Sequence, residues 1–138
     1  MNNYRRYVVE GNPVTKKNSQ QIVKNKTTGR WFMVPSRQYK TFEKDALKQL
    51  EKVKEPEPIT NPVNIRYTFF MVSRRQVDGL NLSAAMDDIL VKAGILADDN
   101  RDIVAGHDGT RVYLSTDTPK TVIEIWDEEN YEQWKQKE

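Results

Sequence analysis

The chain has 138 residues, of which 30% are charged and 37% hydrophobic, with no cysteine and a net charge of +2. This length predicts one domain over residues 1–138, and the lack of cysteine excludes disulfides, thiolate metal sites and cysteine nucleophiles. The first residues carry no apolar leader and no later run is long enough to cross a bilayer, so we expect a cytoplasmic protein with no membrane partner.

The first half of the chain predicts a strand, a polar loop and a helix. Tyr4–Glu10 is the strand, and residues 11–30 form a lysine-rich loop or hairpin before the apolar stretch 31–34. From residue 36 to about 53, apolar residues recur at spacings of three and four, which predicts an amphipathic helix with Ser36 as its N-cap. Its apolar face would carry Tyr39, Phe42, Ala46, Leu47, Leu50 and Val53. Its opposite face would carry Arg37, Lys40, Lys44, Lys48 and Lys52.

The second half alternates between strand and helix patterns. The elements expected are a strand at 63–71, a helix at 82–93 stopped by Gly94, a strand at 103–114 broken by the turn GHDG, a strand at 121–126 and a helix at 127–138. This order predicts an α+β fold, in which two main helices pack on one face of a mixed, largely antiparallel sheet.

The charges are unevenly distributed along the chain. Residues 1–53 hold 12 Lys and Arg against 4 acids, a balance of +8, and residues 54–138 hold 10 against 16, a balance of −6. Such asymmetry indicates a basic surface for a polyanion, joined to an acidic region that repels the polyanion or meets it through a metal ion. Two ordinary solvated faces would give the same totals.

The acids of the second half gather between residues 78 and 102. Mg²⁺ binds through one or two carboxylates plus water and substrate, and it promotes phosphodiester hydrolysis. Asp78, at the entry to the predicted helix, and Asp99, at the start of the next strand, meet if the connecting segment runs back along the helix. The alternatives are that Asp78 caps the helix and that Asp98 and Asp99 form an ordinary acidic turn.

Two further residues of this region have competing interpretations. A helical wheel places Asp88 at the edge of the apolar face and turns Asp87 toward solvent, so Asp88 is the candidate third ligand. Its alternative is a surface ion pair with Lys92, four residues on. His107 is expected to be a turn residue and not a general base.

The basic residues of the first half are candidate phosphate contacts. Such contacts act through charge and counterion release, so they position DNA without reading its sequence. The candidates are Lys16, Lys17, Lys24, Lys26 and Arg30, together with Arg74 and Arg75 after the strand at 63–71. A solvated loop is the alternative for the first five, and Trp31 and Phe32 are expected in a core or an interface.

The order of these motifs resembles the RusA family of Holliday junction resolvases, small endonucleases of phage and prophage genomes. The likeness runs from about residue 8 to residue 126 and rests on GNPVTKKNS, SRQYKTFEKDALKQL, Asp78 with Asn81, Asp88, and ILVKAGILADDN with its pair Asp98-Asp99. It implies a homodimer that cuts four-way DNA in recombination and repair, with Mg²⁺ or Mn²⁺ held by Asp78, Asp88 and Asp99.

Two positions depart from the family pattern. The second Asp of the family motif falls on Leu80 and its Lys on Ala84, so the site would lack one carboxylate and one basic group. Lys16 or Lys17 is the expected substitute for that Lys, and we take Lys17 as the catalytic candidate. The alternatives are a catalytically weak or inactive protein that binds branched DNA on the same scaffold, and a protein-interaction module with incidental acids.

Overall fold

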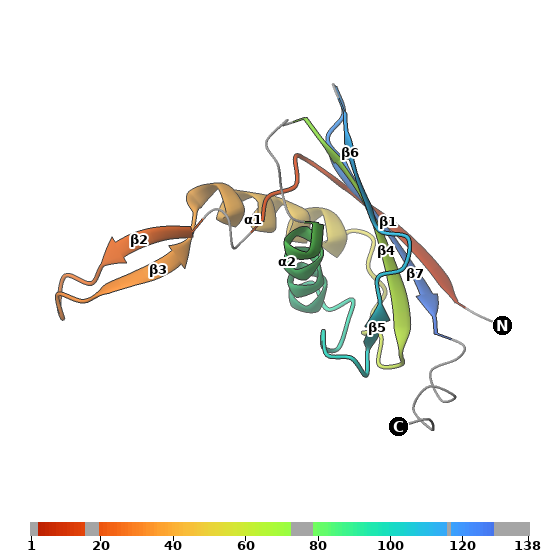
Figure 1. The fold of residues 1–138 in the computed structure, drawn as a ribbon. Coiled ribbons are helices and arrows are strands. Elements are labelled where there is room, and N and C mark those ends of the chain that lie inside the picture. Colours follow the sequence, from red (N-terminus) through yellow and green to blue (C-terminus); the bar gives the residue numbers. More distant parts are fainter. Residues whose placement is uncertain (1–2, 16–19, 73–78, 116, 129–138) are drawn as a thin grey trace.

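The structure is a computed structural model that describes residues 3–15, 20–72, 79–115 and 117–128 (Figure 1). Its elements are β1 (Tyr4–Glu10), β2 (Gln20–Lys24), β3 (Trp31–Pro35), α1 (Arg37–Glu51), β4 (Val63–Met71), α2 (Gly79–Lys92), β5 (Val104–Gly106), β6 (Arg111–Leu114) and β7 (Lys120–Asp127). Figure 1 shows a sheet with both helices on one side and a separate hairpin that projects from the body.

The main sheet has five strands centred on β7 and β4. β7 pairs antiparallel with β1 and with β4, while β5 and β6 both lie parallel to β4 along its other edge. The prediction of an α+β fold with a mixed, largely antiparallel sheet is therefore confirmed.

The core lies between this sheet and the helices. Every second residue of β4 is buried, from Val63 to Met71, as expected for a strand with one face against the core. Ile65 pairs with Ile125, and Tyr67 with Ile123, so the buried faces of β4 and β7 coincide. The helices pack on this face because the contact removes the apolar surfaces of both the helices and the sheet from water.

Helix α1 begins where the sequence predicts. The Ser36 side chain accepts a hydrogen bond from the Tyr39 backbone N–H at 3.1 Å, as an N-cap does. Tyr39, Ala46 and Leu50 are buried. Val53, expected on the apolar face, lies past the last helical turn and is exposed, so that part of the prediction is wrong.

Helix α2 begins three residues before the predicted start and ends at Lys92. Gly94 follows it with a φ of +79°, a left-handed conformation that glycine adopts without steric cost. The predicted orientation of Asp87 toward solvent is wrong, since only 6% of this residue is exposed. Of the fourteen residues of α2, seven are buried, so this helix lacks the single apolar stripe that a helical wheel assumes.

The turn between β5 and β6 is fastened to the middle of β4. The Asn64 side chain accepts from the Asp108 backbone N–H at 2.9 Å and donates to the Asp108 carbonyl at 3.3 Å. The Thr110 hydroxyl accepts from the Tyr67 backbone N–H at 3.1 Å. Gly109 has a φ of +88°, and a Cβ there would come within 2.7 Å of the Arg66 side chain, so the turn requires glycine.

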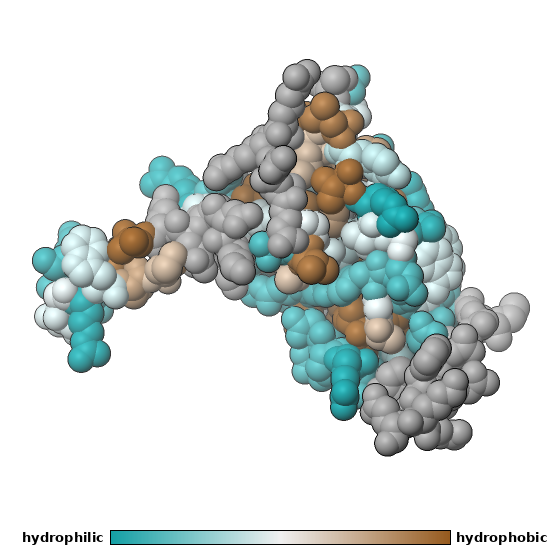
Figure 2. Space-filling model, viewed as in Figure 1, coloured by the Kyte–Doolittle hydropathy of each residue, from teal (hydrophilic) through white to brown (hydrophobic). Residues whose placement is uncertain are grey.

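The hairpin β2–β3 exposes apolar side chains, and some of its apolar surface is visible in Figure 2. Ile22 pairs with Met33, and Val23 with Phe32, so adjacent pairs point to opposite sides of the ribbon. All four side chains are exposed, as is Trp31. The expectation of a core position for Trp31 and Phe32 is wrong for the single chain, while an interface position stays a prediction.

Two sequence expectations concern the ends of the chain and its helices. Most of the predicted helix at 127–138 lies outside the described residues. Among the residues that the structure describes, no helix has the length and apolar character required to span a bilayer.

A core substitution tests the packing of helices on the sheet. Ile65→Ala removes fully buried methyl groups from β4 and should lower the free energy of unfolding by about 2–5 kcal/mol. Val112→Ala, on the exposed strand β6, should change it by no more than about 0.5 kcal/mol. Urea unfolding measures both, and equal losses would contradict the assigned core.

Candidate active site

Asp87 is a carboxylate on the buried side of α2, and both of its oxygens have partners. The Tyr67 hydroxyl, from β4, donates a hydrogen bond to Oδ1. Nε2 of His107 lies 2.8 Å from Oδ2. We call Tyr67, Asp87 and His107 the Asp87 cluster, and it joins α2, the central strand and the turn after β5.

The fastened turn explains how His107 reaches this helix. Because Asn64 and Thr110 hold the turn on β4, the imidazole lies over the Tyr67 ring, with centroids 5.8 Å apart and planes inclined by 26°. The His107 side chain is 31% exposed, whereas the Tyr67 side chain is buried. The cluster is therefore anchored in the core and opens to solvent through the histidine.

Burial and nearby charges shift the pKa values of Tyr67 and His107. Burial and the Asp87 carboxylate raise the pKa of the Tyr67 phenol well above its usual value, so this hydroxyl stays protonated and donates. The hydrogen bond to Asp87 raises the pKa of His107 above its ordinary 6.5, although burial opposes it. The charges of Asp87 and Asp108 act in the same direction as the hydrogen bond.

Asp99 lies in the loop between α2 and β5. The Asp98 carboxylate organises this loop, because it accepts from the Asp99 backbone N–H at 2.7 Å and from the Asn100 side-chain amide at 3.1 Å. Asp99 precedes the first residue of β5, Val104, by five positions, so its predicted place at the start of a strand is wrong. Its residue is exposed to solvent.

The Asp99 carboxylate belongs to the surroundings of the Asp87 cluster. Although the residue is exposed, partial desolvation of its carboxylate, the hydrogen bond with Asp98 and the charges of Asp98 and Asp87 together raise the pKa of Asp99. The Asp99 charge in turn contributes to the raised pKa of Tyr67. The structure thus brings Asp99 and Asp87 close enough for their negative charges to act on one another.

The Asp88 carboxylate contacts a lysine, unlike that of Asp87, which contacts Tyr67 and His107. Its carboxylate lies 3.4 Å from the ammonium of Lys92, the helical ion pair that the sequence offered as an alternative to metal binding. Lys92 also reaches Glu43 of α1 at 3.0 Å. The role of Asp88 as a metal ligand stays a prediction.

The predicted DNA contacts divide into described and undescribed residues. Lys24, Lys26 and Arg30 are exposed at the turn end of the hairpin β2–β3. Figure 1 shows that this hairpin projects away from α2 and the main sheet. Exposed lysines also line the outer side of α1, among them Lys40 and Lys48. Asp78, Lys16, Lys17, Arg74 and Arg75 lie outside the described residues, so their predicted roles stay predictions.

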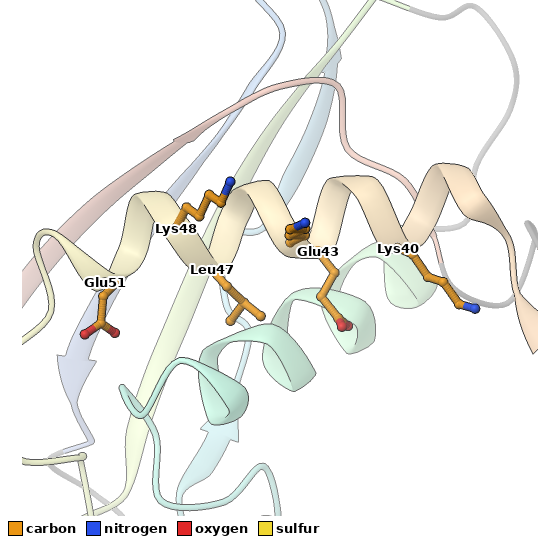
Figure 3. A pocket seen from close by; sticks show the side chains of 6 residues that line it. Lys40, Glu43, Leu47, Lys48 and Glu51 are labelled. Carbon is orange, nitrogen blue, oxygen red and sulfur yellow. The ribbon is translucent and has the colours of Figure 1, made fainter.

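A groove of about 410 Å³ runs along α1, where Glu43 points toward α2 and Leu47 lies between charged side chains (Figure 3). Its lining comes entirely from α1 and contains none of the candidate catalytic acids. The groove is therefore separate from the Asp87 cluster.

Sequence reasoning missed the pairing of Asp87 with His107. The signal was present in α2, where Ser83, Asp87 and Leu90 follow one another at spacings of four and three and are all buried. An acid in a buried stripe requires a partner. The partner, 20 residues further on, depends on how the turn packs on β4, which no local pattern reveals.

The raised pKa of His107 can be measured directly, because it is the only histidine of the chain. Asp87→Asn removes the charge and the carboxylate acceptor, so the pKa of His107 should fall toward 6.5 or below. A pH titration of the imidazole signals by NMR gives both values. The control Glu124→Gln, on the opposite face of the sheet, should leave the pKa of His107 unchanged.

The raised pKa of His107 also determines how this residue changes protein stability with pH. A folded pKa above the unfolded value means that protonated His107 stabilises the protein fully below about pH 6.5, and that this contribution disappears as pH rises through the raised pKa. An unchanged His107 pKa in Asp87→Asn would contradict the assigned pair.

The sequence was also compared with known proteins. The family model described as Endodeoxyribonuclease RusA matches residues 10–126, a range that contains both helices, the hairpin, Asp99 and the Asp87 cluster. No curated protein matches the sequence. The family match confirms the resemblance drawn from the motifs and covers most of the chain. The chain belongs to the RusA family of endodeoxyribonucleases.

Proposed function

We propose that this protein is a metal-dependent endonuclease that resolves four-way DNA junctions by phosphodiester hydrolysis, in recombination and repair. The family match over residues 10–126 carries the proposal. The acidic loop beside the Asp87 cluster and the basic hairpin support it, because a nuclease needs carboxylates at the scissile phosphate and cations along the DNA backbone.

The metal ligands that we propose are Asp99 and Asp78. The described residues contain no group of three His, Asp or Glu side chains placed to hold a metal ion. Two carboxylates are nevertheless enough for Mg²⁺, which keeps several waters and binds substrate phosphate. Asp99 fits this role, since the negative charges of Asp98 and Asp87 beside it favour a cation. Asp78 directly precedes Gly79, the first residue of α2.

Neither helical aspartate is needed as a ligand in this arrangement. Both oxygens of Asp87 are engaged by Tyr67 and His107, and the Asp88 carboxylate pairs with Lys92. When bound, Mg²⁺ or Mn²⁺ would neutralise charge on the phosphate and acidify the attacking water. The chain itself would contribute the carboxylates that hold the cation and the basic side chains that hold the DNA.

Basic residues would position the junction without reading its sequence. Lys24, Lys26 and Arg30 stand at the exposed end of the hairpin, and the lysines of α1 offer a second contact surface. We propose Lys16, Lys17, Arg74 and Arg75 as further contacts, with Lys17 close to the reacting phosphate in place of the basic group that the family pattern has at Ala84.

We further propose a homodimer, because a four-way junction presents symmetric strands for two sites to cut. The hairpin supports this assembly. A two-stranded ribbon alone is marginally stable in water, and this one exposes Ile22, Trp31 and Met33 on one face. A second copy that covers this face would bury apolar surface that the single chain leaves in water.

One observation favours an inactive DNA-binding protein as the second candidate. Leu80, at the position of the family's second Asp, is 78% exposed, and Ala84, at the position of its Lys, is also exposed. Neither side chain serves the core, so the departures cost the fold little and remove two polar groups from the site. Metal-dependent cleavage by the parent protein separates the two candidates.

Substitution of the proposed ligands tests the active enzyme. Asp99→Asn and Asp78→Asn should each abolish Mg²⁺-dependent cleavage of a four-way junction and leave binding equal or tighter, since each removes a negative charge near the phosphate. Asp88→Asn, which disrupts the ion pair with Lys92, should have a smaller effect. Parental cleavage rates in both Asp99→Asn and Asp78→Asn would show that the ligands are wrongly assigned.

Salt dependence tests the hairpin. Replacing Lys24, Lys26 and Arg30 with Ala should weaken junction binding and reduce the slope of log affinity against log salt by about one for each lost phosphate contact. In the same assay, replacing Lys40, Lys44 and Lys48 with Ala measures how much α1 contributes to the salt dependence of binding. An unchanged slope in the hairpin variant would remove the hairpin from the interface.

A further inference from the structure

The Asp87 cluster has an arrangement that burial alone does not require. An ionised carboxylate in a core is costly unless hydrogen bonds compensate it, and an apolar residue at this position of α2 would avoid the cost. Here the Asp87 carboxylate instead accepts a hydrogen bond from the buried Tyr67 hydroxyl and pairs with the partly exposed imidazole of His107. The histidine is the only member of the cluster that solvent and a substrate can reach.

The hydrogen bonds determine which nitrogen of His107 is basic. A carboxylate only accepts hydrogen bonds, so the bond to Oδ2 of Asp87 assigns the proton to Nε2 of His107. The neutral imidazole then has its lone pair on Nδ1. Within the described part of the chain, no hydrogen bond engages Nδ1, which leaves this atom available to a water molecule.

The location of His107 matches a site of hydrolysis. Asp99 lies in the loop that leads from α2 into β5, and His107 directly follows this three-residue strand and bonds to Asp87 of α2. His107 and the proposed metal ligand therefore flank the same short strand beside α2. Three groups face the imidazole: Asp87 from α2, Tyr67 from β4 and Asp108 from its own turn. Two of them are acids, which favour the imidazolium that forms when His107 takes a proton.

We propose that His107 is a catalytic residue that accepts a proton from the attacking water, and that Asp87 and Tyr67 are positioning residues that hold its ring. This proposal rests on the proposed function, because it requires hydrolysis of a phosphodiester. It assigns to the chain a base that the family pattern, as matched here by Asp78, Asn81 and Asp99, does not contain.

The proton and electron balance of the step is simple. The water oxygen bonds to phosphorus while one of its protons passes to Nδ1, and the bond from phosphorus to the leaving sugar oxygen breaks with its electron pair on that oxygen. The leaving oxygen takes a proton from solvent, and the imidazolium later returns one to solvent. The Asp87 carboxylate stabilises the imidazolium in between, as the acid of a His–Asp pair does.

Single-turnover cleavage of a synthetic four-way junction, with protein in excess and Mg²⁺ present, tests this role. His107→Gln keeps an amide N–H that can donate to Asp87 but cannot take the proton, so the cleavage rate should fall by about 10²–10⁴-fold. Junction binding should be retained. Glu124→Gln, which breaks an ion pair with Arg66 on the far face of the sheet, controls for loss of stability.

Two further readouts separate a base from a structural histidine. In His107→Gly, added imidazole should restore part of the rate, with an efficiency that follows the pKa of the imidazole derivative used. In Asp87→Asn, the acid limb of the pH–rate profile should move to lower pH along with the pKa of His107. A purely structural cluster would give neither result.

The outcomes distinguish this inference from the proposed function. If the parent protein cuts the junction and His107→Gln cuts it at the same rate, His107 is not the base, although the nuclease assignment stands. A rate loss without imidazole rescue and without a shift in the Asp87→Asn profile would assign the cluster a structural role and overturn the inference as well. If the parent does not cut with Mg²⁺ or Mn²⁺, the proposed function fails, and this inference fails with it.

Discussion

The buried carboxylate of Asp87 is the constraint on which the rest of this structure depends. Removing a charge from water costs several kcal/mol, and the cost is offset only where good hydrogen bonds remain. Tyr67 and His107 supply those bonds from β4 and from the turn after β5, so α2, the centre of the sheet and that turn are held to one another. If any of the three moved, the charge would be left unpaired in the core.

The sheet topology serves this arrangement. β5 and β6 share one edge of β4, and the turn between them is held on that strand by hydrogen bonds with the Asn64 side chain and the Tyr67 backbone. A single continuous strand along this edge would have no turn there, and His107 would not stand over Tyr67. On the outer side of the molecule, the hairpin carries exposed cations away from the acidic loop. Under the proposed function, phosphate binding and hydrolysis would therefore use separate surfaces.

Much of the fold could be predicted from the sequence, because local patterns determine it. The alternation in β4, the Ser36 cap and the stop at Gly94 are each encoded within a few residues. The candidate site was harder to predict from the sequence. Asp87 was assigned to solvent because a helical wheel assumes one buried stripe, whereas α2 is covered on several sides. The pairing with His107 is a tertiary contact, and it depends on a turn position that only the whole sheet fixes.

The central claim is that the Asp87 cluster and a cation site at Asp99 form one active site. Proton NMR with substoichiometric Mn²⁺ tests it most directly, since paramagnetic broadening depends steeply on distance and the chain has a single histidine. We expect Mn²⁺ to broaden the His107 signals, signals from Gly29 at the hairpin end to stay sharp, and Asp99→Asn to abolish the effect. His107 signals that stay sharp while Mn²⁺ broadens resonances elsewhere would contradict it.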